Sequence, residues 1–228
     1  MSRPIAIGIE NVTIRRAGRL VVDGASLQIA QKSIHVLVGP NGGGKSTLLS
    51  AVLGQLAFTG KIDMTFRGSG AVGFVPQTFV ADRTLPITCA EFLGLARQKR
   101  PVCFGLTKAA QERIATLLAR VGLAGFEHRR IGELSGGELR RVLIANAIDP
   151  APEILLCDEP ASGLDPTAAE ELDKILLALR DDHGTTVVVV SHDREQVMRI
   201  ADRVTRLAVT IEQTGKPDEV LSRQGGAP

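Results

Sequence analysis

A glycine-rich run that ends in a lysine and a serine has the residue types of a phosphate-binding loop. The run and the residue after it are Gly39, Pro40, Asn41, Gly42, Gly43, Gly44, Lys45, Ser46 and Thr47. Its glycines permit backbone angles that turn successive N–H groups onto one anion. The run fits the P-loop pattern, in which the lysine reaches the β- and γ-phosphates of ATP or GTP and the serine hydroxyl is a ligand of Mg²⁺. We therefore expect Lys45 and Ser46 to bind a nucleoside triphosphate together with its magnesium ion.

Two neighbouring carboxylates, Asp158 and Glu159, follow the apolar run from Ile154 to Cys157. Ligands of open parallel sheets bind beyond the carboxyl ends of the strands, so both acids should face the same crevice as the phosphate-binding loop. One carboxylate there can hold the magnesium shell, and the other can orient or deprotonate an attacking water. Read alone, the pair could be a solvated acidic turn. Beside a P-loop, nucleotide hydrolysis is the better interpretation.

A predicted strand and a predicted helix flank the phosphate-binding loop. Residues 33–38 are mostly apolar and read as a buried strand. Ser46 to Leu53 is expected to be a helix whose positive N-terminal end points at the phosphates. Another helix should begin at Asp165-Pro166, with the aspartate as N-cap, and its expected buried face holds Leu172, Ile175, Leu176 and Leu179. Strands separated by helical patterns imply a parallel α/β sheet.

Three more motifs follow in a fixed order: Gln77, then Leu134-Ser135-Gly136-Gly137-Glu138, then Ser191-His192-Asp193. With the first two motifs they make the chain resemble the ATP-binding subunits of ABC transporters, from Ile9 to Val220. The pentapeptide looks like the ABC signature sequence, which is far more specific than a P-loop. Asp158 to Asp165 looks like a Walker B motif running into a D-loop. Gln77 matches the Q-loop of the family and His192 its switch histidine.

This resemblance implies a fold with three parts. They are a P-loop NTPase (RecA-like) α/β core, an N-terminal antiparallel β subdomain and an inserted α-helical subdomain. Residues 1–228 would form a single ABC ATP-binding domain, with the core lobe at about 1–83 and 150–228 and the helical subdomain at about 84–149. Within that insertion, residues 106–121 read as a helix with Ile114, Leu117, Leu118 and Val121 on one face.

The resemblance also implies that two copies of the chain form a head-to-tail homodimer. Each ATP would lie between the P-loop of one subunit and the signature motif of the other. Ser135, Gly136 and Gly137 would then contact the γ-phosphate bound by the partner, and Asp165 would help to form the dimer seam. The signature motif suits this role, because residues 136–147 read as a helix with Ser135 as N-cap. Its positive end would face the same anion.

In the implied mechanism, Lys45 and the loop amides bind phosphate. Ser46, Gln77 and Asp158 organise Mg²⁺ and its waters, and Glu159 positions or deprotonates the attacking water. His192 contacts the γ-phosphate and couples it to the state of the dimer. The cofactors are therefore expected to be ATP and Mg²⁺.

One position departs from the family pattern. ABC ATPases usually place an aromatic ring near the start of the chain to stack on adenine. The resemblance aligns Arg16 near that position, and the chain has no Tyr or Trp. A guanidinium can also stack on a flat π-face, with less buried area. We therefore expect Arg16 to meet the base, base selectivity to be poor and ATP to bind moderately.

Composition limits the other function classes. The formal net charge of +2 gives no electrostatic case for nucleic acid. No signal-peptide pattern opens the chain, and no apolar run approaches the roughly 20 residues of a membrane span. We expect a peripheral protein at the cytoplasmic face of the cell membrane, served by separate permease subunits. The 3 cysteines have no framework spacing and indicate reduced thiols, with Cys157 an inert core residue.

The sequence says less about the cargo. Val72 to Gln77, followed by residues 84–88, resembles the zinc and manganese importer branch, where a similar V-P-Q precedes an L-P-x-T segment. This region would form the groove that receives a helix of the membrane subunit. The expected function is import of zinc or manganese, with an extracytoplasmic solute-binding protein as an indirect partner. Import of iron or a chelate, and regulation of a membrane machine without solute transport, remain as alternatives.

Overall fold

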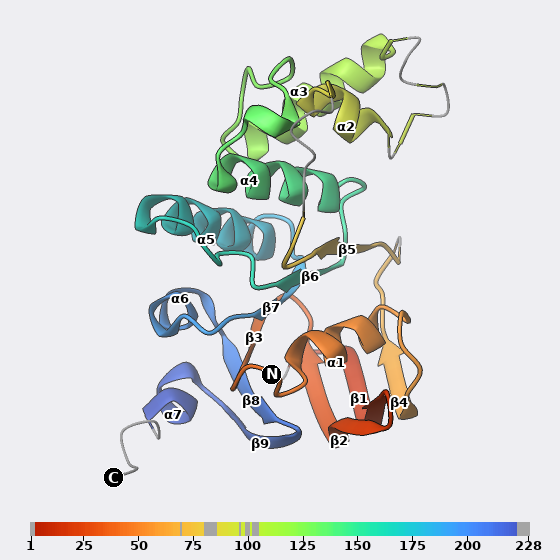
Figure 1. The fold of residues 1–228 in the computed structure, drawn as a ribbon, viewed down its shortest axis with the longest axis vertical. Coiled ribbons are helices and arrows are strands. Elements are labelled where there is room, and N and C mark those ends of the chain that lie inside the picture. Colours follow the sequence, from red (N-terminus) through yellow and green to blue (C-terminus); the bar gives the residue numbers. More distant parts are fainter. Residues whose placement is uncertain are drawn as a thin grey trace.

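The computed structural model describes residues 3–68, 70–79, 86–95, 97–98, 101 and 105–222. Thr84 and Leu85, in the segment 84–88 that resembles the importer branch, lie outside these residues, and so does Cys103, one of the 3 cysteines. The described strands form two sheets, which Figure 1 shows side by side in the lower half of the molecule. The helices α2, α3 and α4 gather at the opposite end.

The larger sheet supports the predicted active site. Its strand order is β5-β6-β7-β3-β8-β9, and all neighbours are parallel except the antiparallel pair β8 and β9. The strands are β5 (Val72–Val75), β6 (Ile154–Asp158), β7 (Thr186–Val190), β3 (Ile34–Val38), β8 (Arg203–Ala208) and β9 (Thr210–Gly215). Every residue of β3, β6 and β7 is buried, which is why these strands read as continuous apolar runs.

Alternate residues of the central strands belong to two hydrophobic cores, one on each face of the sheet. Val36, Leu155 and Val187 pack with apolar side chains of the helices α2 to α7. Leu37 and Leu156 point the other way and pack with α1 (Lys45–Val52) and the smaller sheet. This two-sided burial holds the carboxyl ends of β3, β6 and β7 at one edge, where the loops of the site emerge.

The smaller sheet confirms the predicted N-terminal antiparallel β subdomain. Its order is β2-β1-β4, built from β1 (Ile5–Arg16), β2 (Arg19–Ala30) and β4 (Thr59–Met64). The apolar stretches at residues 5–9 and 26–29, which read as short strands in the sequence, are parts of the longer β1 and β2. The pattern breaks at Asn11, where φ is 48° and the pairing of β1 shifts register, so the alternation of apolar residues is interrupted there.

The helical segment is made of α2 (Cys89–Leu95), α3 (Lys108–Arg120), a 3₁₀ turn at Ile131–Glu133 and α4 (Gly136–Ala147). The predicted stripe on α3 and its C-cap is confirmed, since Ile114, Leu117, Leu118 and Val121 are all buried. The helix begins at Lys108, because the Thr107 side chain caps it by accepting from Ala110 N. The boundaries predicted for the helical subdomain stay a prediction.

The remaining helices complete the outer layer: α5 (Pro166–Asp181), α6 (Arg194–Ile200) and α7 (Pro217–Leu221). The predicted start of α5 is confirmed, because the Asp165 side chain accepts a 3.0 Å hydrogen bond from Ala168 N. Figure 1 shows α5 between α4 and the larger sheet. Nowhere in the described part of the chain is a helix both long and apolar enough to pass through a membrane.

Candidate active site

The phosphate-binding loop connects β3 to α1 and is packed tightly against its neighbours. A Cβ atom on Gly39, where φ is 144°, would lie 2.1 Å from the carbonyl oxygen of Leu207 in β8. A Cβ atom on Gly44, where φ is 94°, would lie 2.6 Å from the carbonyl oxygen of Val21 in β2. Only glycine fits at these two positions, so the loop follows one path between the two sheets.

Lys45 opens α1 and is 5% exposed. Its Nζ donates to the carbonyl oxygens of Gly39 (2.9 Å) and Pro40 (2.8 Å), so the ammonium group lies over the loop. Burial lowers the pKa of Lys45, and the nearby Glu159 and Asp158 oppose that shift. In the described chain, no side chain caps the first turn of α1, which leaves its N–H groups directed at the loop. A lysine and these donors suit a phosphate group.

Ser46 and Asp158 bring together the oxygen donors predicted to bind magnesium. Ser46 Oγ donates a 2.9 Å hydrogen bond to Asp158 Oδ1. Asp158 is 8% exposed, and burial raises its pKa despite that hydrogen bond. A buried carboxylate beside a hydroxyl is the hard oxygen set that Mg²⁺ prefers, and a divalent cation would stabilise the charged form of the acid. The residues therefore fit the predicted ion.

The three predicted catalytic residues, Gln77, Glu159 and His192, come together at the Glu159 carboxylate. Its Oε2 accepts a 3.1 Å hydrogen bond from Gln77 Nε2 and lies 3.5 Å from His192 Nδ1. The three residues come from the loops after β5, β6 and β7, which end at the same edge of the sheet. Glu159 has φ 45°, a left-handed conformation that is costly for a residue with a side chain. Its N–H donates to Val190 O at 3.0 Å, which helps to hold it there.

A cavity of about 430 Å³ contains the phosphate-binding loop and the predicted base contact. Its lining includes Arg16, at the end of β1, and contact of Arg16 with the base stays a prediction. Val21 of β2 also lines it and was not predicted, because a single valine on a strand has no sequence signal that distinguishes it from core. The other lining residues are Asn41, Gly42, Gly43, Gly44, Lys45, Ser46, Thr47, Gln77 and Glu159.

The signature residues lie in a different cavity, of about 300 Å³, together with the D-loop. Ser135 is the N-cap of α4, as predicted: its N–H donates to Glu138 Oε2 (2.7 Å), and its Oγ accepts from Glu138 N (3.3 Å). The structure therefore groups Ser135, Gly136, Gly137 and Asp165 with one another and apart from the P-loop cavity of the same chain.

A buried polar network, which the sequence did not predict, holds the loop that carries His192. Ser191 Oγ donates to Gln196 Oε1, and Gln196 Nε2 donates to Asp173 Oδ1, both at 2.8 Å. Arg199 Nε donates to the second oxygen of Asp173, also at 2.8 Å. Asp173 is 3% exposed and Gln196 1% exposed, so losing one partner would leave buried polar atoms unpaired. The His192 loop is thereby attached to α5, the helix that follows the D-loop.

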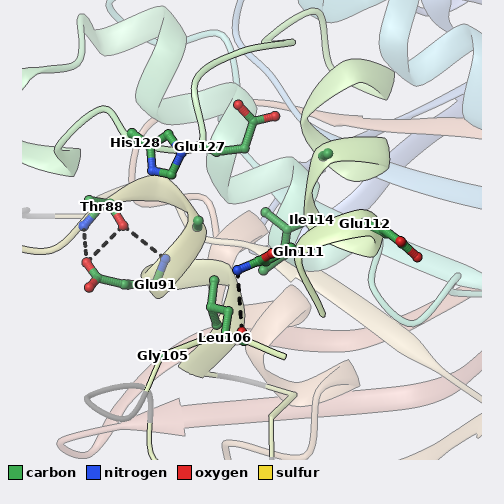
Figure 2. Close-up of a pocket in the computed structure, with 11 residues that line it drawn as sticks. Thr88, Glu91, Gly105, Leu106, Gln111, Glu112, Ile114, Glu127 and His128 are labelled. Atoms are coloured by element: carbon green, nitrogen blue, oxygen red, sulfur yellow. Dashed lines mark hydrogen bonds between the residues drawn. The ribbon is translucent and has the colours of Figure 1, made fainter. Parts of the chain in front are cut away.

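A further cavity, of about 600 Å³, lies in the helical segment away from these groups (Figure 2). Its acidic side chains are Glu91, Glu112 and Glu127, and Leu106 and Ile114 add apolar surface. Glu91 is fixed at the start of α2, where Thr88 N and Thr88 Oγ1 each donate to its Oε2 at 2.8 Å. The lining of this cavity therefore combines apolar and acidic side chains.

Cys157 behaves as predicted. It is fully buried in β6, and burial raises the pKa of its thiol to about 12, which makes the reactive thiolate inaccessible at neutral pH.

The strand–loop–helix unit and the carboxylate pair beside it define a P-loop nucleotide hydrolase. A family model described as ABC transporter matches residues 22–162, and the chain belongs to this family as an ATP-binding ATPase subunit. It is 38% identical to the zinc import ATP-binding protein ZnuC of Cereibacter sphaeroides over 199 residues, 87% of this chain and 77% of that one. It is also 38% identical to ZnuC of Ruegeria pomeroyi over 222 residues, 96% of this chain and 81% of that one.

Solved structures agree on the fold. A nucleotide-free ATP-binding cassette from an ABC transporter superposes with a TM-score of 0.83 at 21% identity, covering 96% of this chain and 94% of that one. CbiO1 of Clostridium perfringens, part of the ABC transporter complex CbiONQ, gives a TM-score of 0.79 at 24% identity, covering 97% and 92%. These structures confirm the predicted fold class. The family model and the ATP-binding relatives confirm the predicted ATPase activity.

Proposed function

We propose that this ATPase powers the import of zinc through separate membrane subunits. The observation that best supports ATP hydrolysis is the position of the Glu159 carboxylate. It lies beside Gln77 and His192 and lines the P-loop cavity. The cargo is supported by the relatives named zinc import ATP-binding protein, with 35–38% identity. The segment from Val72 to Gln77, which resembles the zinc and manganese importer branch, supports the same assignment. Manganese is the second candidate.

In the proposed reaction, Lys45 and the loop amides bind the β- and γ-phosphates of ATP. Ser46 Oγ, Asp158 and Gln77 would hold Mg²⁺, which neutralises phosphate charge when it is bound. Glu159 accepts a proton from the attacking water, and its side chain is 11% exposed, so little bulk water competes for it. His192, whose side chain is 60% exposed, can turn from Glu159 toward a γ-phosphate.

The separation of the two cavities supports a head-to-tail homodimer as the working unit. The P-loop cavity provides a lysine and the uncapped N–H groups of α1, and the signature cavity provides a second helix N-terminus, which Ser135 caps. Anions are stabilised at helix N-termini. A second copy that places Ser135 and Gly137 against the first copy's P-loop would surround the phosphates from both sides.

The acidic cavity of the helical segment is the proposed contact with the membrane permease (Figure 2). Cytoplasmic loops of membrane proteins are rich in Lys and Arg. A short permease helix with one apolar and one basic face would fit this cavity. Its apolar face would pack on Leu106 and Ile114, and its basic face would pair with Glu112 and Glu127. In this proposal the chain would lie at the cytoplasmic face of the membrane. The extracytoplasmic solute-binding protein would act on the permease, without contact to this chain.

The test is the metal content of cells that lack the gene, complemented with the wild-type chain or with Glu159→Gln. A zinc deficit that only the wild-type chain restores is the expected result. A deficit confined to manganese or to iron would change the proposed cargo to that metal and would leave the proposed role in import unchanged. Normal metal levels with a division or envelope defect would contradict import and favour a regulatory ATPase.

A further inference from the structure

Arg140 connects the signature helix to the Q-loop of the same chain. It lies on α4, two residues after the capping Glu138, and is half-buried. Its Nη1 donates to Pro76 O at 2.6 Å and its Nη2 donates to Gln77 O at 2.9 Å. The guanidinium group is a planar fork of donors, and here it spans two successive carbonyl groups. A lysine in its place could not bond both carbonyls with the same fixed geometry.

The two carbonyls belong to the residues at which the chain leaves the sheet. The strand β5 ends at Val75, so Pro76 and Gln77 lie beyond its ladder with β6. Arg140 supplies hydrogen bonds at the point where the sheet stops supplying them. Fixing the Gln77 carbonyl fixes the peptide plane from which its side chain departs.

The chain of contacts continues from Gln77 to the proposed catalytic base. Gln77 Nε2 donates to Glu159 Oε2 at 3.1 Å, and the same oxygen lies 3.5 Å from His192 Nδ1. The guanidinium of Arg140 is therefore separated from the Glu159 carboxylate by one residue. At the N-terminal end of the same helix, Ser135, the signature serine, is the N-cap of α4.

We propose that Arg140 is a positioning residue that couples the signature helix to the Q-loop and holds the Gln77 amide on Glu159. This inference rests on the proposed roles of Gln77 and Ser135. When the signature end of α4 engages a nucleotide on a second copy, a displacement of the helix moves the Pro76 and Gln77 carbonyls with it. Arg140 thereby makes ATP hydrolysis at the chain's own P-loop site sensitive to whether its signature motif contacts the nucleotide of a second copy.

A double-mutant cycle on the purified full chain tests the proposal. The variants are Arg140→Gln, Gln77→Ala and the double variant, compared by the kcat and KM of ATP hydrolysis. Arg140→Gln should lower kcat about tenfold, the value of a lost charge-assisted hydrogen bond. It should leave the KM for ATP within about twofold, because the P-loop is untouched. The double variant should be no slower than Gln77→Ala, because Arg140 acts through that residue.

Two further variants separate positioning from mere folding. Arg140→Lys should restore part of the lost kcat, because an ammonium group can still donate to one of the two carbonyls. Arg120→Gln, at the exposed end of α3, is the matched control and should keep the wild-type kcat. Thermal unfolding of each variant shows whether a loss of activity follows a loss of folded protein. If Arg140→Gln does not fold, Arg140→Lys takes its place in the cycle.

The outcomes distinguish this inference from the function on which it rests. A Gln77→Ala variant with wild-type kcat would refute the proposed role of Gln77. It would also refute the proposed coupling, because Arg140 is proposed to act through Gln77. A slow Gln77→Ala beside a normal Arg140→Gln would overturn the coupling alone. The coupling would also be overturned if the kcat losses of Arg140→Gln and Gln77→Ala multiplied in the double variant, since the two residues would then act independently. It would be overturned as well if the kcat loss of Arg140→Gln matched a lower folded fraction, since Arg140 would then be a structural residue only.

Discussion

Ser46 and Asp158 share a 2.9 Å hydrogen bond although 112 residues separate them in the chain. The contact joins the start of α1 to the end of β6, so the hydroxyl and the carboxylate are already in place for one cation. Asp158 is mostly buried, and its raised pKa reflects the cost of keeping a charge there. Magnesium should relieve that cost when it binds between the two groups.

We expect Ser46→Ala and Asp158→Asn to weaken the response to magnesium more than the binding of nucleotide. Each variant removes one hard oxygen ligand and leaves Lys45 and the loop amides intact. The Mg²⁺ concentration for half-maximal ATP hydrolysis should rise by about tenfold or more. Titrating Mg²⁺ at saturating ATP measures this directly. An unchanged titration for both variants would remove the pair from the magnesium site.

Arg16 should make the base contact permissive. It lines the nucleotide cavity from the end of β1, where a guanidinium can stack on any purine. We expect similar kcat/KM values for ATP and GTP, and Arg16→Ala should raise the KM of both by a similar factor. Arg16→Tyr should lower the KM for ATP. An ATP preference of about a hundredfold or more in the wild-type chain would sink this account of the base contact.

The interior of the larger sheet should make stability depend on pH. His35 is 1% exposed, and its Nε2 lies 2.8 Å from Thr205 Oγ1. Burial, with a smaller contribution from Arg203, lowers the pKa of His35 to about 4. Below its ordinary pKa near 6.5 the unfolded chain therefore binds a proton that the folded chain refuses, so stability falls as the pH drops from about 6.5 to about 4.

Urea unfolding at neutral pH and near pH 5 measures that dependence. The free energy of unfolding should fall by about 2 kcal/mol over this interval through His35. His35→Gln keeps a hydrogen-bonding side chain that does not titrate, and it should lose this part of the slope. An identical slope in the wild-type chain and the variant would show that other groups control the pH response.

Charge reversal in the cavity of Figure 2 should uncouple the ATPase from its permease. The double variant Glu112→Lys/Glu127→Lys places cations where we expect basic permease side chains. Basal ATP hydrolysis by the purified chain should stay unchanged, whereas stimulation by the permease should fall by about tenfold. Glu10→Lys, an exposed reversal on β1, is the control. Full stimulation of the double variant would exclude this cavity as the contact.

The features that the sequence predicts best are those set by neighbouring residues. The glycine loop, the caps at Ser135 and Asp165 and the apolar stripe on α3 each follow from a few consecutive positions. The roles of Gln77 and His192 came from the resemblance, since alone they are ordinary polar residues. The position of Arg16 came from alignment with the family, and in the structure Arg16 lines the same cavity as the P-loop.

Contacts between distant segments could not be predicted in this way. Arg140 meets Pro76 and Gln77 only because α4 passes over the end of β5, and a pair of arginines in a sequence reads as a solvated face. The buried pair Asp173 and Gln196 depends likewise on how α5 packs against α6. Such residues carry polar side chains at helical positions, and nothing in their local pattern says that they are buried.

The most direct test of the central claim is ATP turnover and dimer formation by Glu159→Gln, with Lys45→Ala beside it. The amide of Glu159→Gln cannot take a proton from water, so kcat should fall about a hundredfold or more while ATP remains bound. Size-exclusion chromatography with Mg-ATP should then show a stable dimer, which Lys45→Ala should fail to form because it binds ATP poorly. Normal turnover by Glu159→Gln would contradict the assignment of Glu159 as the residue that activates water.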